Sequence, residues 1–323
     1  MNRIIALIAC ENDSGRRLDR ILRKQFPAFS LSFINRLLRK KKVLVNGNAR
    51  EGGYRVACGD RIEIKHAGEP ETPDQTPGSR IPEPETPESK RPSLCIVYED
   101  DDLLVVDKPA GMLTHGTLDT PDTLGTPEKE SLASAVTAYL ADKIPASLSF
   151  RPGPLHRLDR NTSGLVVFGK SLKGAQFFTQ ATQNGHVKKY YLAIVDGVLE
   201  KEAVWEDYLV RDKAKKITRA ANGDSQKTAE TAKKAVLRVR PIKTENGATL
   251  IEAEISSGKT HQIRVQCNIH GHPLRGDKKY GGSFQKNSQK SSQKTGYFLR
   301  AYKIVIHKYG GPLVLTVPEQ RIL

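Results

Sequence analysis

Near the middle of the chain, several charged side chains directly precede an apolar run, in the stretch HRLDRNTSGLVVFGK, residues 156–170. Asp159 stands between Arg157 and Arg160. A carboxylate in such a position can act as a general base or as a nucleophile. It can also cap a turn or form an exposed ion pair, which contributes less than about 1 kcal/mol. On this stretch alone, the second interpretation is favoured.

Three other chemistries fit the sequence poorly. In the protein-kinase catalytic loop Asp directly follows Arg, whereas here Leu158 separates them, and the chain lacks a Gly-rich phosphate loop and a DFG motif. Ser163 does not lie in a GxSxG elbow. A zinc site usually combines two ligand pairs, and only one close group of potential ligands is present: Cys267, His270 and His272, with His261 upstream. We therefore expect no metal site.

The residues after the charged stretch predict the element that holds it. Gly164 and the apolar residues 165–168 indicate a buried strand, which would place the polar loop rigidly. Elsewhere in this part of the chain, strands outnumber long helices and rarely alternate with them. Helices are expected from Ser131, over 171–182 and after a cap at Thr260. The pattern predicts an α+β fold with a mixed, mainly antiparallel sheet, and argues against a doubly wound parallel sheet.

The composition indicates a polyanionic partner. The 323 residues carry a formal net charge of +16, and the pI is about 9.6. No apolar run is long enough to span a bilayer, so we expect RNA and no membrane contact. The opening MNRIIALIAC favours an edge strand over a signal peptide. The four cysteines form no CxxC pair, which suits a reducing compartment and predicts a cytoplasmic protein.

Composition also divides the chain into three predicted parts. Residues 1–66 are expected to form a basic domain, because residues 16–65 hold fourteen Lys and Arg against four acidic residues. Residues 67–93 are rich in Pro, Glu, Thr and Ser, and predict a flexible linker. Residues 94–323 are expected to form the larger domain, interrupted by a low-complexity Ser/Gln/Lys loop over 283–296.

The basic domain shows two helical patterns followed by a hairpin. Ser30 and Ser32 are possible N-caps between the helices, and Asn46-Gly47 is a hairpin turn signal. Residues 17–64 resemble the alpha-L motif, an RNA-binding module of two helices and a hairpin first seen in a small-subunit ribosomal protein. Cations at the helices favour phosphate contacts, and the residues expected to bind RNA are Arg20, Arg36, Arg39, Lys40, Lys41 and Lys42.

The larger domain resembles the RluA-type family of RNA pseudouridine synthases. HRLDRNTSGLVVFGK looks like the family signature. Three further blocks match in the family's order: YEDDDLLVVDKPAGMLTH, KKYYLAIVDG and SGKTHQIRVQCNIHGHPLRGDKKYGG. Together with the basic domain, the resemblance covers nearly the whole chain outside the linker and the low-complexity loop. Several long motifs in order are more specific than a single short pattern.

The resemblance implies a mixed, mainly antiparallel sheet flanked by helices. It also implies conversion of uridine to pseudouridine within RNA, with no cofactor or metal. On this chain Asp159 matches the catalytic aspartate, Tyr191 the tyrosine that stacks under the target uracil, and Arg264 the arginine that pairs with the aspartate. Arg157 is expected to enter the RNA beside the displaced nucleotide.

Two positions depart from the family pattern. Asn161 replaces a second Asp found in many members, which should matter little for the chemistry. Residues 299–301 read Leu-Arg-Ala where the family has Leu-His-Ala, and this puts the local packing in doubt.

The required chemistry agrees with the implied residues. The target base must leave the RNA stack at a cost of a few kcal/mol, which an inserted arginine and a stacking aromatic ring offset. A nearby arginine favours a charged carboxylate. Three routes remain open for Asp159: attack on the ribose anomeric carbon, attack on the uracil ring, or removal of a ribose proton.

The family members that carry the alpha-L module imply 23S-type large-subunit ribosomal RNA as substrate, with transfer RNA as the second choice, and we expect a monomer. The competing hypothesis is a non-catalytic RNA-binding or ribosome-assembly factor that kept the fold. The joint presence of Asp159, Tyr191 and Arg264 argues against it, because a protein that only binds RNA gains nothing from that combination.

Overall fold

The structure is a computed structural model. It describes residues 3–66, 94–116, 131–212, 214–215, 217–221, 231–282, 296–308 and 310–318. The predicted linker, and the predicted low-complexity loop except residue 296, lie outside the described residues. The chain forms two compact units: unit 1 comprises Met1–Ser93, Thr137–Gly153 and Gly169–Gly174, and unit 2 comprises Leu94–Val136, Pro154–Phe168 and Ala175–Leu323.

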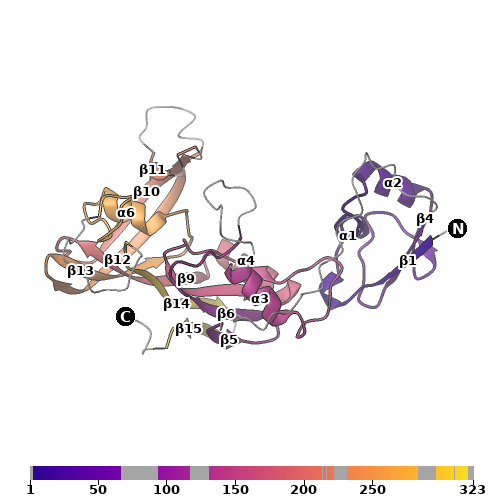
Figure 1. Ribbon diagram of the computed structural model, residues 1–323, viewed down its shortest axis with the longest axis horizontal. Coiled ribbons are helices and arrows are strands. Elements are labelled where there is room, and N and C mark those ends of the chain that lie inside the picture. Colours follow the sequence, from indigo (N-terminus) through magenta and orange to yellow (C-terminus); the bar gives the residue numbers. More distant parts are fainter. Residues whose placement is uncertain are drawn as a thin grey trace, which may run out of the picture. The chain divides into compact units, whose positions relative to one another are not determined.

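Unit 1 contains the predicted two helices and hairpin (Figure 1). The helices are α1 (Leu18–Gln25) and α2 (Leu31–Arg39), after a short 3-10 turn η1 (Glu11–Asp13). A four-stranded antiparallel sheet has the order β1-β4-β2-β3. Its strands are β1 (Arg3–Ile8), β2 (Val43–Val45), β3 (Asn48–Ala49) and β4 (Arg61–His66). β1 pairs with β4 at the end of this order, so the predicted edge strand is confirmed.

Local sequence explains these elements. The Ser30 hydroxyl accepts a hydrogen bond from the backbone N–H of Phe33, which confirms Ser30 as the cap of α2. Asn46 and Gly47 both have positive φ, at 51° and 79°, as the two-residue hairpin turn requires. The apolar residues of both helices and of the sheet are buried together, and this core includes Leu18, Ile21, Leu22, Ile34, Val43 and Ile64.

Asp13 binds a segment distant in sequence within unit 1. Its carboxylate accepts hydrogen bonds from the Ser147 hydroxyl, from the hydroxyl and N–H of Ser149, and from the N–H of Leu148, at 2.7–3.1 Å. Burial raises the pKa of Asp13, but these hydrogen bonds outweigh that effect and lower it to about 2. Lys24 adds a hydrogen bond from its ammonium to the Ser149 carbonyl, at 2.7 Å. Residues 147–149 are therefore fixed to the helical part of unit 1.

Unit 2 is built on a mixed sheet of eleven strands among the described residues (Figure 1). The order along its main path is β11-β10-β12-β13-β9-β14-β8-β6-β5, with β15 paired to β14 and β7 to β8. Most pairs are antiparallel, whereas β14 and β8 are parallel. The predicted α+β class and mainly antiparallel sheet are confirmed.

The bounds of the strands follow the sequence patterns. They are β5 (Ile96–Glu99), β6 (Leu103–Lys108), β7 (Gly153–Pro154), β8 (Ser163–Gly169), β9 (Val187–Asp196), β10 (Ala203–Asp212), β11 (Ile217–Ala220), β12 (Lys233–Glu245), β13 (Ala248–Ile255), β14 (Leu299–Lys308) and β15 (Gly311–Thr316). The remaining helices with bounds in the described residues are α3 (Leu132–Leu140), α4 (Leu172–Gln183) and α6 (Gln262–Ile269). The helix α6 packs on β10, β11 and β12, and Phe178 of α4 is buried in the core of the sheet.

The predicted cap of α6 at Thr260 is wrong. The N-cap is His261, which has the left-handed conformation φ 57°, ψ 24° and makes no side-chain cap hydrogen bond. The side chain of Gln262 accepts a hydrogen bond from the Lys259 N–H at 3.1 Å. The Gln262 side chain, which is inside the helix, thus pairs with a backbone N–H of the preceding loop, and Thr260 does not act as a cap.

The strand predicted behind the charged stretch is confirmed as β8. All four residues from Leu165 to Phe168 are fully buried. Where β8 begins, Gly164 has φ 112° and pairs with Ala301 of the parallel strand β14. A Cβ atom on Gly164 would lie 2.1 Å from the Ala301 carbonyl oxygen. The close approach of the two backbones therefore requires glycine.

No helix in the described ranges is long and apolar enough to cross a membrane.

We predict that Gly164→Ala destabilises unit 2 by about 3 kcal/mol or more, because the added methyl group meets backbone atoms and the left-handed φ is strained. Denaturant unfolding of the full chain measures the effect. Gly258→Ala is the matched control, since the nearest atom to its Cβ is 4.0 Å away, and it should change the free energy of unfolding little. Equal effects of the two substitutions would contradict this account.

Candidate active site

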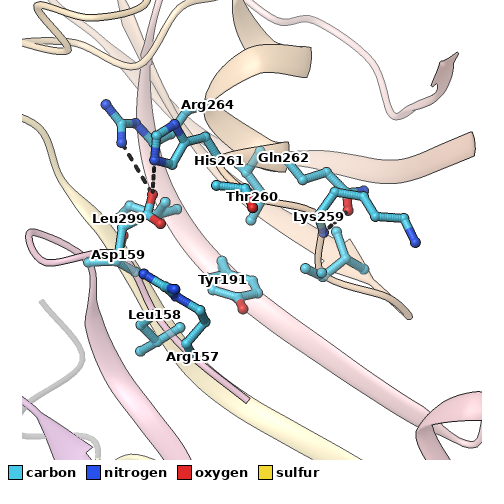
Figure 2. Close-up of a pocket in the computed structure, with 14 residues that line it drawn as sticks. Arg157, Leu158, Asp159, Tyr191, Lys259, Thr260, His261, Gln262, Arg264 and Leu299 are labelled. Atoms are coloured by element: carbon cyan, nitrogen blue, oxygen red, sulfur yellow. Dashed lines mark hydrogen bonds and ion pairs between the residues drawn. The ribbon is translucent and has the colours of Figure 1, made fainter. Parts of the chain in front are cut away.

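The predicted site residues of unit 2 surround one pocket (Figure 2). Arg157 and Asp159 come from the loop before β8, Tyr191 from β9, and Arg264 from α6. The other lining residues are Leu158, Thr162, Ile255, Gly258, Lys259, Thr260, His261, Gln262, Ile263 and Leu299. The structure thus brings together four residues that lie up to 107 positions apart in the sequence.

An arginine links two carboxylates in this pocket. Arg264 donates from Nη1 to Oδ2 of Asp159 at 3.2 Å, shown as a dashed line in Figure 2. Its Nε and Nη2 donate to the two oxygens of Asp277, at 2.7 and 2.9 Å. The Arg264 side chain is 8% exposed and that of Asp277 is 1% exposed, whereas Asp159 is 23% exposed. Asp277 therefore fixes the guanidinium, and Asp159 remains accessible from the pocket.

Two aromatic rings complete the environment of this guanidinium. The Arg264 Cζ lies 5.0 Å from the ring centre of Tyr280 and 4.5 Å from that of Tyr297. Burial lowers the pKa of Arg264, but its hydrogen bonds to Asp277 and the neighbouring negative charges raise it overall. Burial also raises the pKa of Tyr297 to about 12, so this phenol stays neutral. Arg264 is consequently a permanent, oriented cation beside Asp159.

Tyr191 offers a buried ring at the pocket. It is 6% exposed, and burial together with the charge of Asp159 raises the pKa of its hydroxyl, which keeps the ring neutral. Its directly opposed neighbours on the two flanking strands are Ala253 and Ala301. Opposed residues in antiparallel strands point to the same face, so these two alanines lie on the same face of the sheet as the ring.

Arg157 is exposed at the pocket. In the part of the chain that the structure describes, its guanidinium forms no ion pair. It is therefore available to an external anion or base.

Lys108 was missed by the sequence reasoning, although it follows the apolar residues 103–106 and Asp107 at the end of a strand in one of the matched blocks. The residue is fully buried, and its ammonium donates to the carbonyls of Pro109, Met112 and Arg160 at 2.9, 2.9 and 3.1 Å. Burial lowers the pKa of Lys108 to about 8, against the opposing charges of Asp159 and Asp107. Lys108 thereby ties the loop after β6 to the loop that carries Asp159.

Further hydrogen bonds join the same two loops. The Gly111 N–H donates to the Arg160 carbonyl at 2.8 Å, and Arg160 Nε donates back to the Gly111 carbonyl at 3.0 Å. The Thr114 hydroxyl donates to the Leu158 carbonyl at 3.0 Å. The backbone on both sides of Asp159 is thus fixed before any substrate arrives.

Arg300, which departs from the family pattern, has a partner in the sheet. Its Nη2 donates to Oδ2 of Asp107 at 2.8 Å, and the two side chains are 11% and 8% exposed. This ion pair gives the arginine a charged partner, but Arg300 Nε and Asp107 Oδ1 are buried without a hydrogen bond among the described residues, so the local packing is not fully satisfied.

The predicted RNA-binding residues lie in unit 1 and are all exposed, namely Arg20, Arg36, Arg39, Lys40, Lys41 and Lys42. Arg39 and Lys41 also line a groove together with Arg50, which lies over the ring of Tyr54 at 5.1 Å. Arg50 was not singled out from the sequence, because it is separated from the other cations by the hairpin. The groove is lined by these three cations and by the acidic Glu51, and the cations can contact a phosphate backbone.

Within the described ranges, no three His, Cys, Asp or Glu side chains gather as a metal site would require. Burial raises the pKa of the Cys267 thiol and makes it a poor ligand or nucleophile. His270 instead contacts Asp207 at 3.1 Å.

Comparison with solved structures shows a similar fold. The structure of human RNA pseudouridylate synthase domain containing 1 superimposes with a TM-score of 0.52 at 19% identity, covering 72% of this chain and 86% of that one. The RNA pseudouridylate synthase family model matches residues 102–269, and the S4 domain model matches residues 16–62. The chain belongs to the RNA pseudouridylate synthase family and carries an S4 RNA-binding domain.

The chain is also similar in sequence to curated proteins over most of its length. The chain is 32% identical over 278 residues to ribosomal large subunit pseudouridine synthase D of Nitrosomonas europaea, covering 86% of this chain and 72% of that protein. It is 32% identical over 283 residues to ribosomal large subunit pseudouridine synthase C of Vibrio cholerae, covering 84% and 78%. The predicted RluA-type membership is confirmed.

We predict that Arg264→Lys lowers kcat for pseudouridine formation by about 100-fold, because an ammonium cannot hold Asp277 with two parallel bonds and still reach Asp159. The assay is tritium release from RNA labelled at carbon 5 of uridine. Arg275→Lys is the matched control, since Arg275 pairs with Asp196 at 2.8 Å and does not line the pocket. A kcat for Arg264→Lys within twofold of wild type would refute the role of the Arg264 guanidinium in holding both Asp277 and Asp159.

Proposed function

We propose that this protein isomerises specific uridines of large-subunit ribosomal RNA to pseudouridine, with Asp159 as the catalytic carboxylate. One observation carries the assignment of Asp159. Its Oδ2 is held by Arg264 at 3.2 Å, while Oδ1 receives no hydrogen bond from the described residues and belongs to a group that lines the pocket. A carboxylate that is fixed through one oxygen presents the other to a substrate in a defined direction.

The RNA class is supported by the relatives and by the S4 domain. Both relatives named above are synthases of the ribosomal large subunit, at 32% identity. The exposed cations of α2 and the adjoining loop suit a folded RNA with closely spaced phosphates. Transfer RNA is the second candidate. Ribosomal RNA as substrate would also place the protein in the cytoplasm.

The proposed roles of the other residues follow from their positions. The buried ring of Tyr191 offers a stacking surface for a uracil that has left the RNA helix. Arg157, which is exposed and without an ion pair in the described residues, fills the space that the uracil vacates. Both contacts offset the few kcal/mol that base flipping costs.

The reaction must also exclude water. Isomerisation breaks the bond between the ribose and N1 of uracil, turns the base in place, and joins the ribose to C5. A released uracil or a hydrolysed ribose would end the sequence without product. The buried residues 165–168 of β8 lie behind the loop, and the hydrogen bond from Lys108 to the Arg160 carbonyl fixes the loop on this side of the pocket. Whether Asp159 acts on the ribose carbon, the uracil ring or a ribose proton, the same carboxylate position serves.

We predict that Asp159→Asn abolishes tritium release from large-subunit ribosomal RNA labelled at carbon 5 of uridine, because an amide can neither attack nor accept the proton. Binding of the RNA should change little. Asp101→Asn, an exposed carboxylate elsewhere in unit 2, is the control and should retain wild-type activity.

Three results would count against the proposal. Tritium release by Asp159→Asn at the wild-type rate would exclude Asp159 as the catalytic group. Tritium release by the wild-type protein from transfer RNA but not from ribosomal RNA would show that transfer RNA is the substrate. A protein that releases no tritium from either RNA would match the competing hypothesis of a binding factor.

A further prediction concerns the S4 domain. Replacing the five cations at the end of α2, Arg36, Arg39, Lys40, Lys41 and Lys42, by Gln should weaken RNA binding and flatten the slope of log K against log salt by about 3. The control replaces three exposed lysines of unit 2, Lys201, Lys243 and Lys308. Equal slopes for both variants would contradict a specific role of α2 in phosphate contact.

A further inference from the structure

His261 occupies a strained position at the pocket. It lies directly before α6 with φ 57° and ψ 24°, a left-handed conformation that is uncommon for residues other than glycine and asparagine. Its side chain is 13% exposed and lines the same pocket as Asp159 (Figure 2). His261 makes no cap hydrogen bond, and the family resemblance implied no role for it, so neither explains a histidine in this conformation.

The neighbours of the two ring nitrogens favour one tautomer of His261. The backbone N–H of Thr218 donates to the Tyr280 hydroxyl oxygen at 3.1 Å. That hydroxyl lies 2.8 Å from Nδ1 of His261 and can either donate to it or accept from it. The carboxylate of Asp159 on the other side of the ring favours the tautomer in which the hydroxyl donates to Nδ1 and the imidazole hydrogen is on Nε2. The opposite tautomer would direct the lone pair of Nε2 at a carboxylate and is disfavoured.

The Nε2 atom faces the carboxylate proposed as catalytic. It lies 3.8 Å from Oδ2 of Asp159, the oxygen that also accepts from Arg264 at 3.2 Å. Figure 2 shows both contacts converging on this carboxylate. At 3.8 Å the contact is longer than a hydrogen bond. Hydrogen bonds in active sites are often long in the free enzyme and shorten to normal distances only in the complex with substrate.

The surroundings keep the imidazole neutral. Burial lowers the pKa of His261 to about 4, and the cations Arg264, Lys279 and Arg211 act in the same direction, whereas Asp159 opposes them. Near pH 7 the ring therefore carries one hydrogen, which is directed to Asp159 by the bond from Tyr280. A neutral N–H donor can orient a carboxylate without adding a second full charge beside Arg264.

We propose that His261 is a positioning residue for Asp159. Its Nε2–H closes on Oδ2 when RNA enters the pocket, and together with Arg264 it stops rotation of the carboxyl group, so that Oδ1 faces the reacting nucleotide. This inference rests on the proposed catalytic role of Asp159. His261 exchanges no proton in this role, and therefore the same function is expected of any neutral donor held at the Nε2 position.

Three substitutions test the proposal in the full chain. His261→Asn and His261→Gly both suit the left-handed backbone, and neither can place a donor at the Nε2 position. His261→Gln extends its amide NH2 group toward that position. We expect kcat for tritium release to fall about 30-fold in the Asn and Gly variants with KM for the RNA unchanged, and the Gln variant to recover at least a third of the wild-type kcat.

A purely structural role predicts a different result. If His261 acted only through the structure, kcat would fall together with the thermal midpoint. The Asn and Gly variants relieve backbone strain, so they would then be at least as active as the Gln variant. Comparable loss in Asn, Gly and Gln variants, or wild-type kcat in all three, would overturn the proposal. Should the Gln variant fail to fold, added imidazole should restore kcat to His261→Gly, and the lack of such rescue would overturn the proposal as well.

Asp159→Asn, assayed alongside, separates the two levels of inference. Activity retained by Asp159→Asn would remove the proposed catalytic role, and the positioning role with it. An inactive Asp159→Asn combined with full activity of His261→Asn would refute only the positioning role.

Discussion

The arrangement of the site depends on the hydrogen bonds of the buried Arg264 guanidinium. Its guanidinium bonds both oxygens of Asp277, which is 1% exposed, and its third contact reaches Asp159 at 3.2 Å. A buried cation without such partners would be strongly destabilising, and removing one partner typically costs several kcal/mol. The pair with Asp277 therefore stabilises the cation independently of substrate, and Asp159 is oriented by a group that is itself already fixed.

The sheet and its loops supply the second constraint, which is the position of the backbone around Asp159. β8 enters the sheet parallel to β14 at a separation that only Gly164 permits, and Lys108 holds three carbonyls of the adjoining loops. The Lys108 ammonium pairs with these carbonyls in a buried setting, where unpaired polar groups are costly. The backbone is consequently fixed next to the partly exposed carboxylate of Asp159.

The sequence allowed prediction of the elements and of the groups with matched motifs, but not of their tertiary partners. Periodicity located β8, and matched blocks pointed to Asp159, Tyr191 and Arg264, which the structure places around one pocket. Asp277 and Lys108 could not be assigned, because an aspartate or lysine near a glycine-rich stretch is more often a surface residue than a buried one. The cap at Thr260 was mispredicted because capping rules describe side-chain oxygens, whereas the chain enters α6 through a left-handed His261.

The neighbours of Tyr191 in the sheet are small side chains. The residues opposite it on β13 and β14 are Ala253 and Ala301, which are buried and carry no functional group. Valine or leucine at either position would bring branched carbons against the ring. Larger side chains at these two positions would thus change the surroundings of Tyr191 within the sheet, with every residue that lines the pocket left intact.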